Sequence, residues 1–138
     1  ESCTGGWVAQ AMTAVAGSSA WFDRGFVTYS NSAKMDLLGV PEEILARFGA
    51  VSEQTVLAMA HGALHHSQAQ VACAISGIAG PGGGSDSKPV GTVCFAWSMA
   101  NGPADCETRH LPGDRREVRA RAVQHALAGV LARLAAMP

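Results

Sequence analysis

The sequence has little net charge and no long apolar run, and both absences narrow its possible partners. Charged residues make up 15% of the chain and the formal net charge is −1, so no general electrostatic attraction draws the protein to nucleic acid or to an anionic membrane. No apolar stretch approaches the roughly 20 residues that span a bilayer, and no signal-peptide pattern opens the chain. We therefore expect a cytoplasmic protein with no nucleic-acid and no membrane partner.

Lysine, tyrosine and closely spaced cysteines are also scarce. The four cysteines show no C-x-x-C spacing, which favours reduced, buried thiols over a zinc or dithiol site. The chain has only two lysines and a single tyrosine, and Lys34 follows Tyr29 by five residues. A hydroxyl nucleophile needs a base, and a lysine is one known solution. Lys34 is therefore a candidate base, although a solvated surface position is the more common fate of a lysine.

The opening six residues, Glu1-Ser2-Cys3-Thr4-Gly5-Gly6, contain the strongest candidate nucleophile. They place a hydroxyl and a thiol directly before two glycines and an apolar run of helical period. Glycines allow backbone to approach a ligand closely, and the start of a helix offers free N–H groups. Such a corner can hold an attacking Ser2 and stabilise the oxyanion that follows. The alternative is that Ser2 only caps the helix.

Helical and extended patterns alternate along the chain. Apolar residues recur at helical spacing at 7–15, 56–64 and 118–134, and shorter helices are expected at 32–38 and 42–48. Ser52 and Asp114 are the predicted caps of two of these helices. Runs of β-forming or apolar residues predict strands at 22–29, 71–76, 90–98 and 107–111. We expect an α/β fold, a single three-layer α/β/α domain over residues 1–138 whose central sheet is mostly parallel or mixed.

A glycine-rich segment follows one predicted buried strand. Ser76-Gly77-Ile78-Ala79-Gly80-Pro81 leads into Gly82-Gly83-Gly84 without the lysine of a P-loop. Such strand ends commonly carry ligand-contacting loops in α/β folds. Ser76 and Gly77 are therefore candidate binding residues, whereas 82–87 is expected to be a flexible surface connection.

Taken in order, these motifs resemble one known family over the whole chain. They are Glu1–Gly6, Gly17–Ser19, Gly25–Asn31, Lys34, Gly49–Ser52, Ser76–Pro81, Lys88–Val93 and Gly113–Arg115. The chain resembles the CinA C-terminal domain family, the nicotinamide-nucleotide amidases. The resemblance implies hydrolysis of the carboxamide of nicotinamide mononucleotide to nicotinate mononucleotide and ammonia. It also implies that an N-terminal strand and helix usual in the family are missing here. A non-catalytic nucleotide-binding or protein-interaction module linked to competence or DNA damage is the alternative.

The resemblance also assigns roles to single residues. Ser2 matches the proposed nucleophile, and Tyr29 and Lys34 match the residues proposed to activate it. Ser76 matches a pocket position, and Arg116 falls where the family has a basic residue near the active site. Besides these, Thr4, Gly5, Gly6 and Gly77 are candidate substrate-binding residues, through backbone N–H groups. The implied chemistry requires no cofactor and no metal, and family precedent together with the Ala-rich last helix favours a homo-oligomer.

Three other interpretations remain open at the level of sequence. Cys3 is chemically the better nucleophile, and a helix start could lower its pKa. His61 and His65 lie four residues apart on one predicted helix face, a spacing that can hold a divalent metal. Arg116 has arginine neighbours at positions 115, 119 and 121, so it could belong to a solvated helix face.

Overall fold

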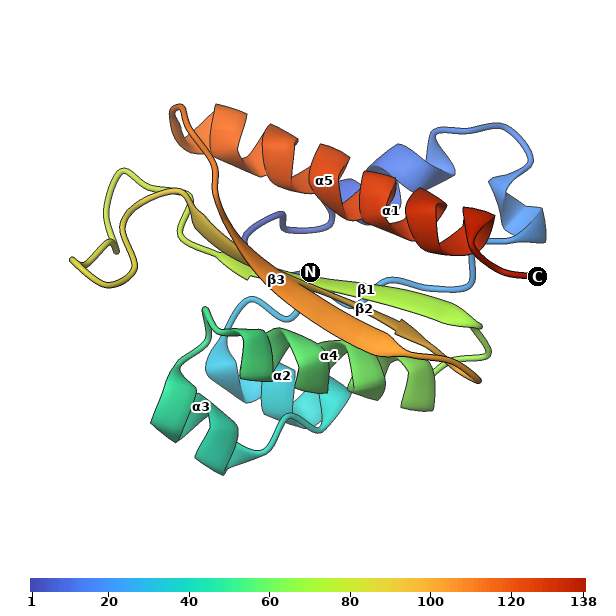
Figure 1. Cartoon of the computed structure of the whole chain (residues 1–138), viewed down its shortest axis with the longest axis horizontal. Coiled ribbons are helices and arrows are strands. Elements are labelled where there is room, and N and C mark those ends of the chain that lie inside the picture. Colours follow the sequence, from blue (N-terminus) through green and yellow to red (C-terminus); the bar gives the residue numbers. More distant parts are fainter.

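A three-stranded sheet lies between two layers of helices. The computed structural model describes residues 1–138. The sheet consists of β1 (Val71–Gly77), β2 (Thr92–Met99) and β3 (Ala104–His110), in that spatial order. α2 (Asn31–Leu38), α3 (Glu42–Phe48) and α4 (Glu53–His65) cover one face, and α1 (Trp7–Thr13) and α5 (Arg115–Ala135) cover the other (Figure 1). A short 3-10 helix, η1 (Ser18–Ala20), follows α1. The three-layer α/β/α prediction is confirmed.

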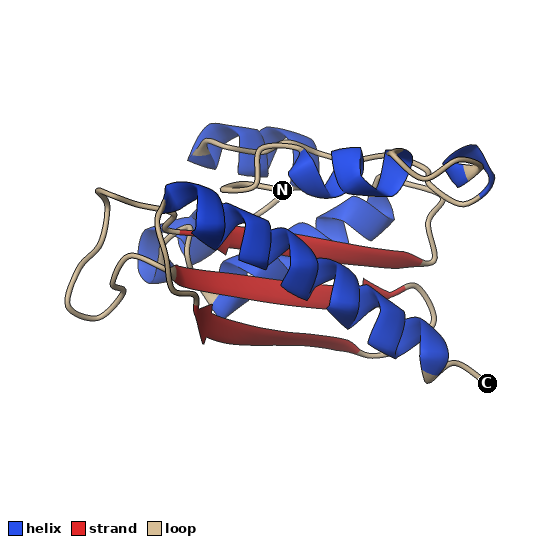
Figure 2. Cartoon of the chain, turned by 90° about the horizontal axis from the view of Figure 1, so that it is seen from above, coloured by secondary structure: helices blue, strands red, loops and turns tan.

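The prediction of a mostly parallel or mixed sheet was wrong. Both strand pairs are antiparallel, with Ser76 opposite Cys94 and Cys94 opposite Thr108. The reason lies in the connections, because residues 78–91 and 100–103 contain no helix. A parallel pair needs a crossover connection, usually a helix, whereas these loops return the chain directly alongside the preceding strand. All the helices instead come before or after the three strands in the sequence, and Figure 2 shows the long helix next to the C-terminus crossing over the sheet.

The strand predicted at 22–29 does not form. The segment is extended but has no ladder partner. Apart from the bond of the Phe22 amide to the Ser18 carbonyl, its backbone–backbone bonds reach only Glu1. The Thr28 amide donates to the Glu1 carbonyl at 2.9 Å, and the Glu1 nitrogen donates to the Phe26 carbonyl at 2.7 Å. The β-forming residues of this segment favour an extended backbone, but no neighbouring strand pairs with it, so no β-strand forms.

Side-chain caps fix the starts of the longer helices. Ser52 Oγ accepts from the Thr55 amide at 3.2 Å, and Asp114 Oδ1 accepts from the Glu117 amide at 2.9 Å. Both predicted caps are therefore confirmed. Ser30 caps α2 in the same way, through the Ala33 amide at 3.1 Å. This cap starts the helix that carries Lys34.

The sheet separates two hydrophobic cores. Alternate side chains of a strand point to opposite faces, so Ile75 and Phe95 pack toward α5, whereas Ala74 and Ala96 pack toward α4. Trp97 joins the α5 side and donates its indole N–H to the Ala126 carbonyl at 3.0 Å. None of the helices is both long and apolar enough to cross a membrane.

The contact between α2 and α4 depends on a glycine. Gly62 is buried in α4, and a Cβ there would overlap the Leu38 carbonyl at the end of α2. Alanine in place of a helical glycine ordinarily stabilises by up to about 1 kcal/mol. We expect Gly62→Ala to have the opposite sign and to destabilise by about 1–3 kcal/mol, as overpacking does.

Thermal or denaturant unfolding of purified Gly62→Ala measures this effect. Gly82→Ala is the control, because a Cβ at Gly82 meets nothing within 4 Å. A Gly62→Ala variant as stable as the parent would show that α2 does not pack this closely on α4.

Candidate active site

Ser2 lies at the outer edge of β1, at the start of a tight turn. Its amide donates to the Ile75 carbonyl at 3.0 Å, and its own carbonyl accepts from the Gly5 amide at 3.0 Å. Gly5 and Gly6 have φ values of 58° and 101°, a region that glycine enters without strain. The turn leads directly into α1, as the sequence predicts. Ser2 is thereby held between the sheet edge and a helix start.

Lys34 reaches Ser2 from the opposite layer of the domain. Its Nζ lies 3.0 Å from Ser2 Oγ, 2.7 Å from the Thr28 carbonyl oxygen and 3.3 Å from the Tyr29 carbonyl oxygen. The Lys34 side chain is fully buried. A neutral amine has two hydrogens and one lone pair, so donation to the two carbonyls leaves the lone pair for the Ser2 hydroxyl. The three contacts fit an unprotonated lysine acting as base toward Ser2.

Burial favours this neutral form of Lys34. Removal of the ammonium from water lowers the pKa of Lys34 from its ordinary value, and the only opposing influence is a smaller one from Cys3. No carboxylate forms an ion pair with Lys34 to hold its charge. Lys34 can therefore be unprotonated, and act as a base, at a lower pH than an ordinary lysine.

A pocket of about 280 Å³ opens over the Ser2–Lys34 pair. Its walls come from β1, the glycine-rich loop and the start of α5, and its lining includes Ser76, Gly77 and Arg115. Ser76 is 1% exposed, and its hydroxyl makes no hydrogen bond within the protein. The structure thus brings Ser2, Tyr29, Lys34, Ser76 and Gly77 together at one pocket.

The residues expected to supply free N–H groups at the helix start do not line this pocket. The Gly6 amide donates to the Glu1 carboxylate at 3.2 Å, and the Gly5 amide is used by the Ser2 carbonyl. Thr4 is fully buried, and its hydroxyl also donates to Glu1, at 2.6 Å. Thr4, Gly5 and Gly6 therefore build the turn that carries Ser2 and lie outside the lining of this pocket.

Free amides lie instead on the β1 side of the pocket. Because the Ile75 carbonyl faces Ser2, strand alternation turns the Gly77 amide toward the same edge, away from β2. The amides of Ala79 and Gly80 donate no hydrogen bond within the protein, and both residues line the pocket. These N–H groups could stabilise an oxyanion formed beside Ser2.

Tyr29 occupies the rim of the pocket. Its side chain is 63% exposed, and its hydroxyl lies 3.4 Å from Arg115 Nη2. Only its main-chain carbonyl meets Lys34. The phenol therefore does not stand between Lys34 and Ser2, which are in direct contact.

Of the two adjacent arginines that begin α5, Arg115 lies at the Ser2 pocket. Its Nη1 donates to the Gly80 carbonyl at 2.8 Å. The sequence-predicted Arg116 lines a neighbouring open basin together with Trp7, Asp114 and Arg119. The basin and the pocket share Ala79 and Arg115 in their linings, so the two are adjacent. Arg115, Arg119 and Glu1 are the residues at this site that sequence reasoning missed.

The alternative sites have less support in the geometry. Cys3 is buried in the core on the α5 side, and burial raises the pKa of its thiol to about 11, which disfavours the reactive thiolate. His61 and His65 are exposed on α4, and no three His, Cys, Asp or Glu side chains are placed to hold a metal ion together.

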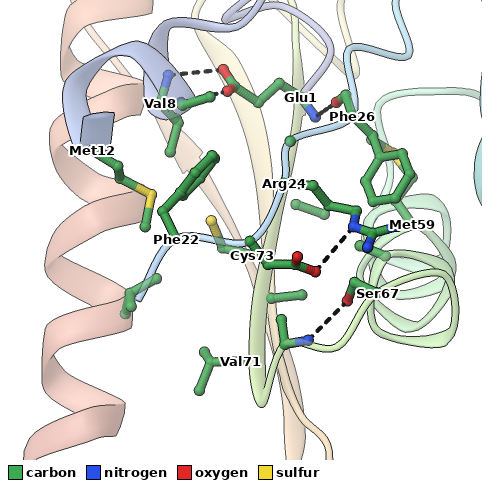
Figure 3. Close-up of a pocket in the computed structure, with 18 of the residues that line it drawn as sticks. Glu1, Val8, Met12, Phe22, Arg24, Phe26, Met59, Ser67, Val71 and Cys73 are labelled. Atoms are coloured by element: carbon green, nitrogen blue, oxygen red, sulfur yellow. Dashed lines mark hydrogen bonds and ion pairs between the residues drawn. The ribbon is translucent and has the colours of Figure 1, made fainter. Parts of the chain in front are cut away.

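A separate apolar cavity lies on the outer edge of β1. Its lining includes Met12, Phe22, Phe26, Met59 and Val71, and Glu1 stands at one end (Figure 3). It holds no nucleophile–base pair of its own, so the candidate chemistry stays at Ser2.

The fold and the site together define an α/β domain in which a buried lysine contacts a serine at a pocket. Comparison with known proteins identifies the family of this domain. The model of the CinA C-terminal domain matches residues 1–134. The chain therefore belongs to the CinA C-terminal domain family.

Similar proteins include the nicotinamide-nucleotide amidohydrolase PncC of Escherichia coli K12. It is 58% identical over 127 residues, which are 92% of this chain and 77% of that protein. The PncC of Pseudomonas putida is 53% identical, over 95% of this chain and 81% of that protein. The crystal structure of a competence/damage inducible protein from Agrobacterium tumefaciens superposes with a TM-score of 0.92 at 55% identity. The superposition covers 95% of this chain and 80% of the Agrobacterium tumefaciens chain.

Proposed function

We propose that this protein is a serine amidase that converts nicotinamide mononucleotide to nicotinate mononucleotide and ammonia. The observation that carries the mechanism is the 3.0 Å contact between buried Lys34 Nζ and Ser2 Oγ at the floor of a pocket. The substrate is inferred from relatives at 53% and 58% identity whose names specify a nicotinamide-nucleotide amidohydrolase.

The first half-reaction forms an ester on Ser2. The Ser2 hydroxyl gives its proton to Lys34 Nζ as Oγ attacks the carboxamide carbon, which makes a tetrahedral oxyanion. The amides of Gly77, Ala79 and Gly80 stabilise that oxyanion, and each such donor contributes about 100-fold or more in rate. The carbon–nitrogen bond then breaks, and the Lys34 ammonium returns its proton to the leaving nitrogen, which departs as ammonia.

The second half-reaction releases the acid. Water attacks the ester carbon and gives a proton to neutral Lys34, and the Ser2–acyl bond breaks. Ser2 recovers its proton from Lys34, and nicotinate mononucleotide leaves. The Ser76 hydroxyl, which has no protein partner, is placed to bind the substrate in the pocket.

Arginines at the start of α5 supply partners for the phosphate of the substrate. Arg116 makes no hydrogen bond or ion pair within the protein and lines the basin that adjoins the Ser2 pocket. Arg115 stands between the two, at the Gly80 carbonyl. A guanidinium binds a phosphate through paired N–H groups, so a nucleotide would extend from Ser2 past Arg115 toward Arg116.

Removal of Arg116 tests this placement. We expect Arg116→Ala to raise KM for nicotinamide mononucleotide about 10-fold or more, because a hydrogen bond to a charged group contributes about 1.5–3 kcal/mol. Turnover of nicotinamide riboside, which lacks the phosphate, should not change. Arg121→Ala is the matched control, since Arg121 lies on the same helix outside the basin lining. An unchanged KM in Arg116→Ala would place the phosphate elsewhere.

The activity itself is tested by ammonia release. The purified protein is incubated with nicotinamide mononucleotide and EDTA, and ammonia and nicotinate mononucleotide are measured together. Equal amounts of both products would support a metal-independent amidase. No release from a folded protein would overturn the proposal and favour the non-catalytic nucleotide-binding or interaction module.

A further inference from the structure

The turn that carries Ser2 makes few hydrogen bonds of its own. Within residues 2–6 the only backbone bond joins the Gly5 amide to the Ser2 carbonyl, and two consecutive glycines with positive φ follow the nucleophile. Glycine is the most conformationally permissive residue. The position of Ser2 relative to Lys34 therefore depends on groups outside the turn.

Glu1 holds the turn on its N–H side. One carboxylate oxygen accepts from the Thr4 hydroxyl at 2.6 Å, the Gly6 amide at 3.2 Å and the Val8 amide at 3.0 Å. The other accepts from the Ala9 amide at 2.8 Å, and Figure 3 shows the carboxylate reaching the backbone at Val8. Gly6, the residue before α1, has no side chain with which to cap the helix. Glu1 supplies that cap, and its negative charge suits the positive end of the helix dipole.

Arg119 holds the same turn on its carbonyl side. Its Nε donates to the Cys3 carbonyl at 3.0 Å, and its Nη2 donates to the Thr4 carbonyl at 3.2 Å. The guanidinium also lies 5.5 Å from the centre of the Trp7 ring, at the start of α1. Arg119 belongs to α5, whose buried face packs on the sheet. The turn is thereby attached to α5, and α5 in turn packs on the sheet that carries Ile75.

We propose that Glu1 and Arg119 are positioning residues that together hold the Ser2 turn in register with Lys34; this inference rests on the proposed function of Ser2 as nucleophile. Glu1 contacts the N–H groups and Arg119 the C=O groups of one short segment, with the nucleophile beside both. Neither side chain touches Ser2 Oγ or Lys34 Nζ. Their effect on the reaction passes through the backbone, where a displacement of about 1 Å can lower the rate about 100-fold.

The test measures the reactivity of Ser2 directly, without the nucleotide. Parent and variants are treated with diisopropyl fluorophosphate, and transfer of the diisopropylphosphoryl group to Ser2, with loss of fluoride, is followed by peptide mass spectrometry to give a second-order rate constant. We expect Glu1→Gln to lower this rate constant about 10-fold or more, because the amide nitrogen of glutamine cannot accept the backbone N–H groups. Arg119→Lys should have a similar effect, since an ammonium cannot hold two carbonyls in the fixed geometry of a guanidinium.

Glu53→Gln is the matched control. Like Glu1, Glu53 is a half-buried carboxylate, and it lies in the first turn of α4 and accepts from the Thr108 hydroxyl at 3.1 Å. It is remote from the Ser2 turn in the hydrogen-bond network. The Glu53→Gln variant should lose about as much stability as Glu1→Gln, but its Ser2 should be labelled at the parental rate. With nicotinamide mononucleotide, Glu1→Gln should lower kcat with little change in KM, and the acid limb of its pH profile should stay at the parental pH.

The outcomes separate the two proposals. No labelling of Ser2 in the parent would overturn the serine nucleophile itself. Rapid labelling of the parent and equally rapid labelling of Glu1→Gln and Arg119→Lys would overturn the positioning role while leaving the nucleophile in place. Equal slowing in Glu53→Gln would show that general destabilisation, and not positioning, sets the rate.

Discussion

Ser2→Ala is expected to lower kcat for ammonia release about 1,000-fold or more while the protein stays folded. Loss of a nucleophile removes the covalent route entirely, and only binding and oxyanion stabilisation remain. The fold should tolerate the change, because the Ser2 amide and carbonyl, and not its hydroxyl, make the bonds to Ile75 and Gly5. The measurement is single-turnover kinetics with nicotinamide mononucleotide, with a thermal melt to confirm folding.

Cys3→Ala is the matched control, because Cys3 is the neighbouring candidate nucleophile. Its thiol is buried with a pKa raised to about 11, so we expect Cys3→Ala to keep most of the activity. Acid quenching during turnover should show the acyl group on the peptide that contains Ser2. The reverse pattern, an active Ser2→Ala and an inactive Cys3→Ala, would contradict the serine mechanism.

Local signals in the sequence predicted the helices, whereas strand direction depended on the connections. Ser52 and Asp114 cap α4 and α5 as expected, since a cap is a contact within one turn of the chain. The predicted direction of the strands was wrong because nothing local marks residues 78–91, of which 82–87 is expected to be a flexible surface connection, as the return of an antiparallel pair. The strand predicted at 22–29 failed for a different reason, as extended backbone becomes a strand only beside a partner.

The arginines of α5 are a part of the site that could have been predicted from helical periodicity. The buried face of α5 includes Val118, Ala122 and Ala126. Counting back three residues from Val118 and from Ala122 gives Arg115 and Arg119, on the same face. Those two reach the Ser2 pocket and the Ser2 turn, whereas Arg116 points to the open basin. The run of arginines in the sequence indicated a charged helix start, and the helix face determined which arginines lie at the Ser2 pocket and the Ser2 turn.

Glu1 had no such signal. Its carboxylate caps a helix that begins six residues later, and that contact exists only because Gly5 and Gly6 turn the chain back over it. A capping pattern in sequence is recognised when the side chain directly precedes the helix. Here the residue in that position is Gly6, which has no side chain, so the sequence indicated an uncapped helix with free N–H groups. The structure shows those groups already bound.

Lys34→Met is expected to lower kcat about 100- to 10,000-fold, the range contributed by a general base. Methionine preserves much of the buried volume but cannot accept the Ser2 proton. Lys34→Arg should lose as much activity, because a guanidinium stays charged and has no lone pair to offer. In the parent, kcat/KM should fall as the pH drops through the pKa of Lys34, which burial holds below the ordinary value of a lysine. On this acid limb, the logarithm of kcat/KM should fall with the slope expected when a single proton is bound.

The same lowered pKa predicts how stability depends on pH. Between the pKa of Lys34 in the folded protein and its ordinary value near 10.5, the unfolded chain binds more protons than the folded one. Stability of the parent therefore rises with pH across that window. Lys34→Met lacks this contribution, so the melting temperature of the variant minus that of the parent should be most positive at the acid end and should shrink toward pH 10. A difference independent of pH would mean that Lys34 is buried with its ordinary proton affinity and is not prepared to act as a base.

Tyr29→Phe decides whether the proton passes through the phenol. Because Lys34 Nζ contacts Ser2 Oγ directly and the Tyr29 hydroxyl lies at the exposed rim beside Arg115, we expect Tyr29→Phe to lose less kcat than Lys34→Met. Its acid limb should stay at the parental pH, since the group that titrates is unchanged. A loss as large as that of Lys34→Met, with the limb displaced, would require the phenol to move into the path between lysine and serine when substrate binds. The direct contact would then be the resting arrangement of the base, and the Tyr29 hydroxyl would be the group that transfers the proton.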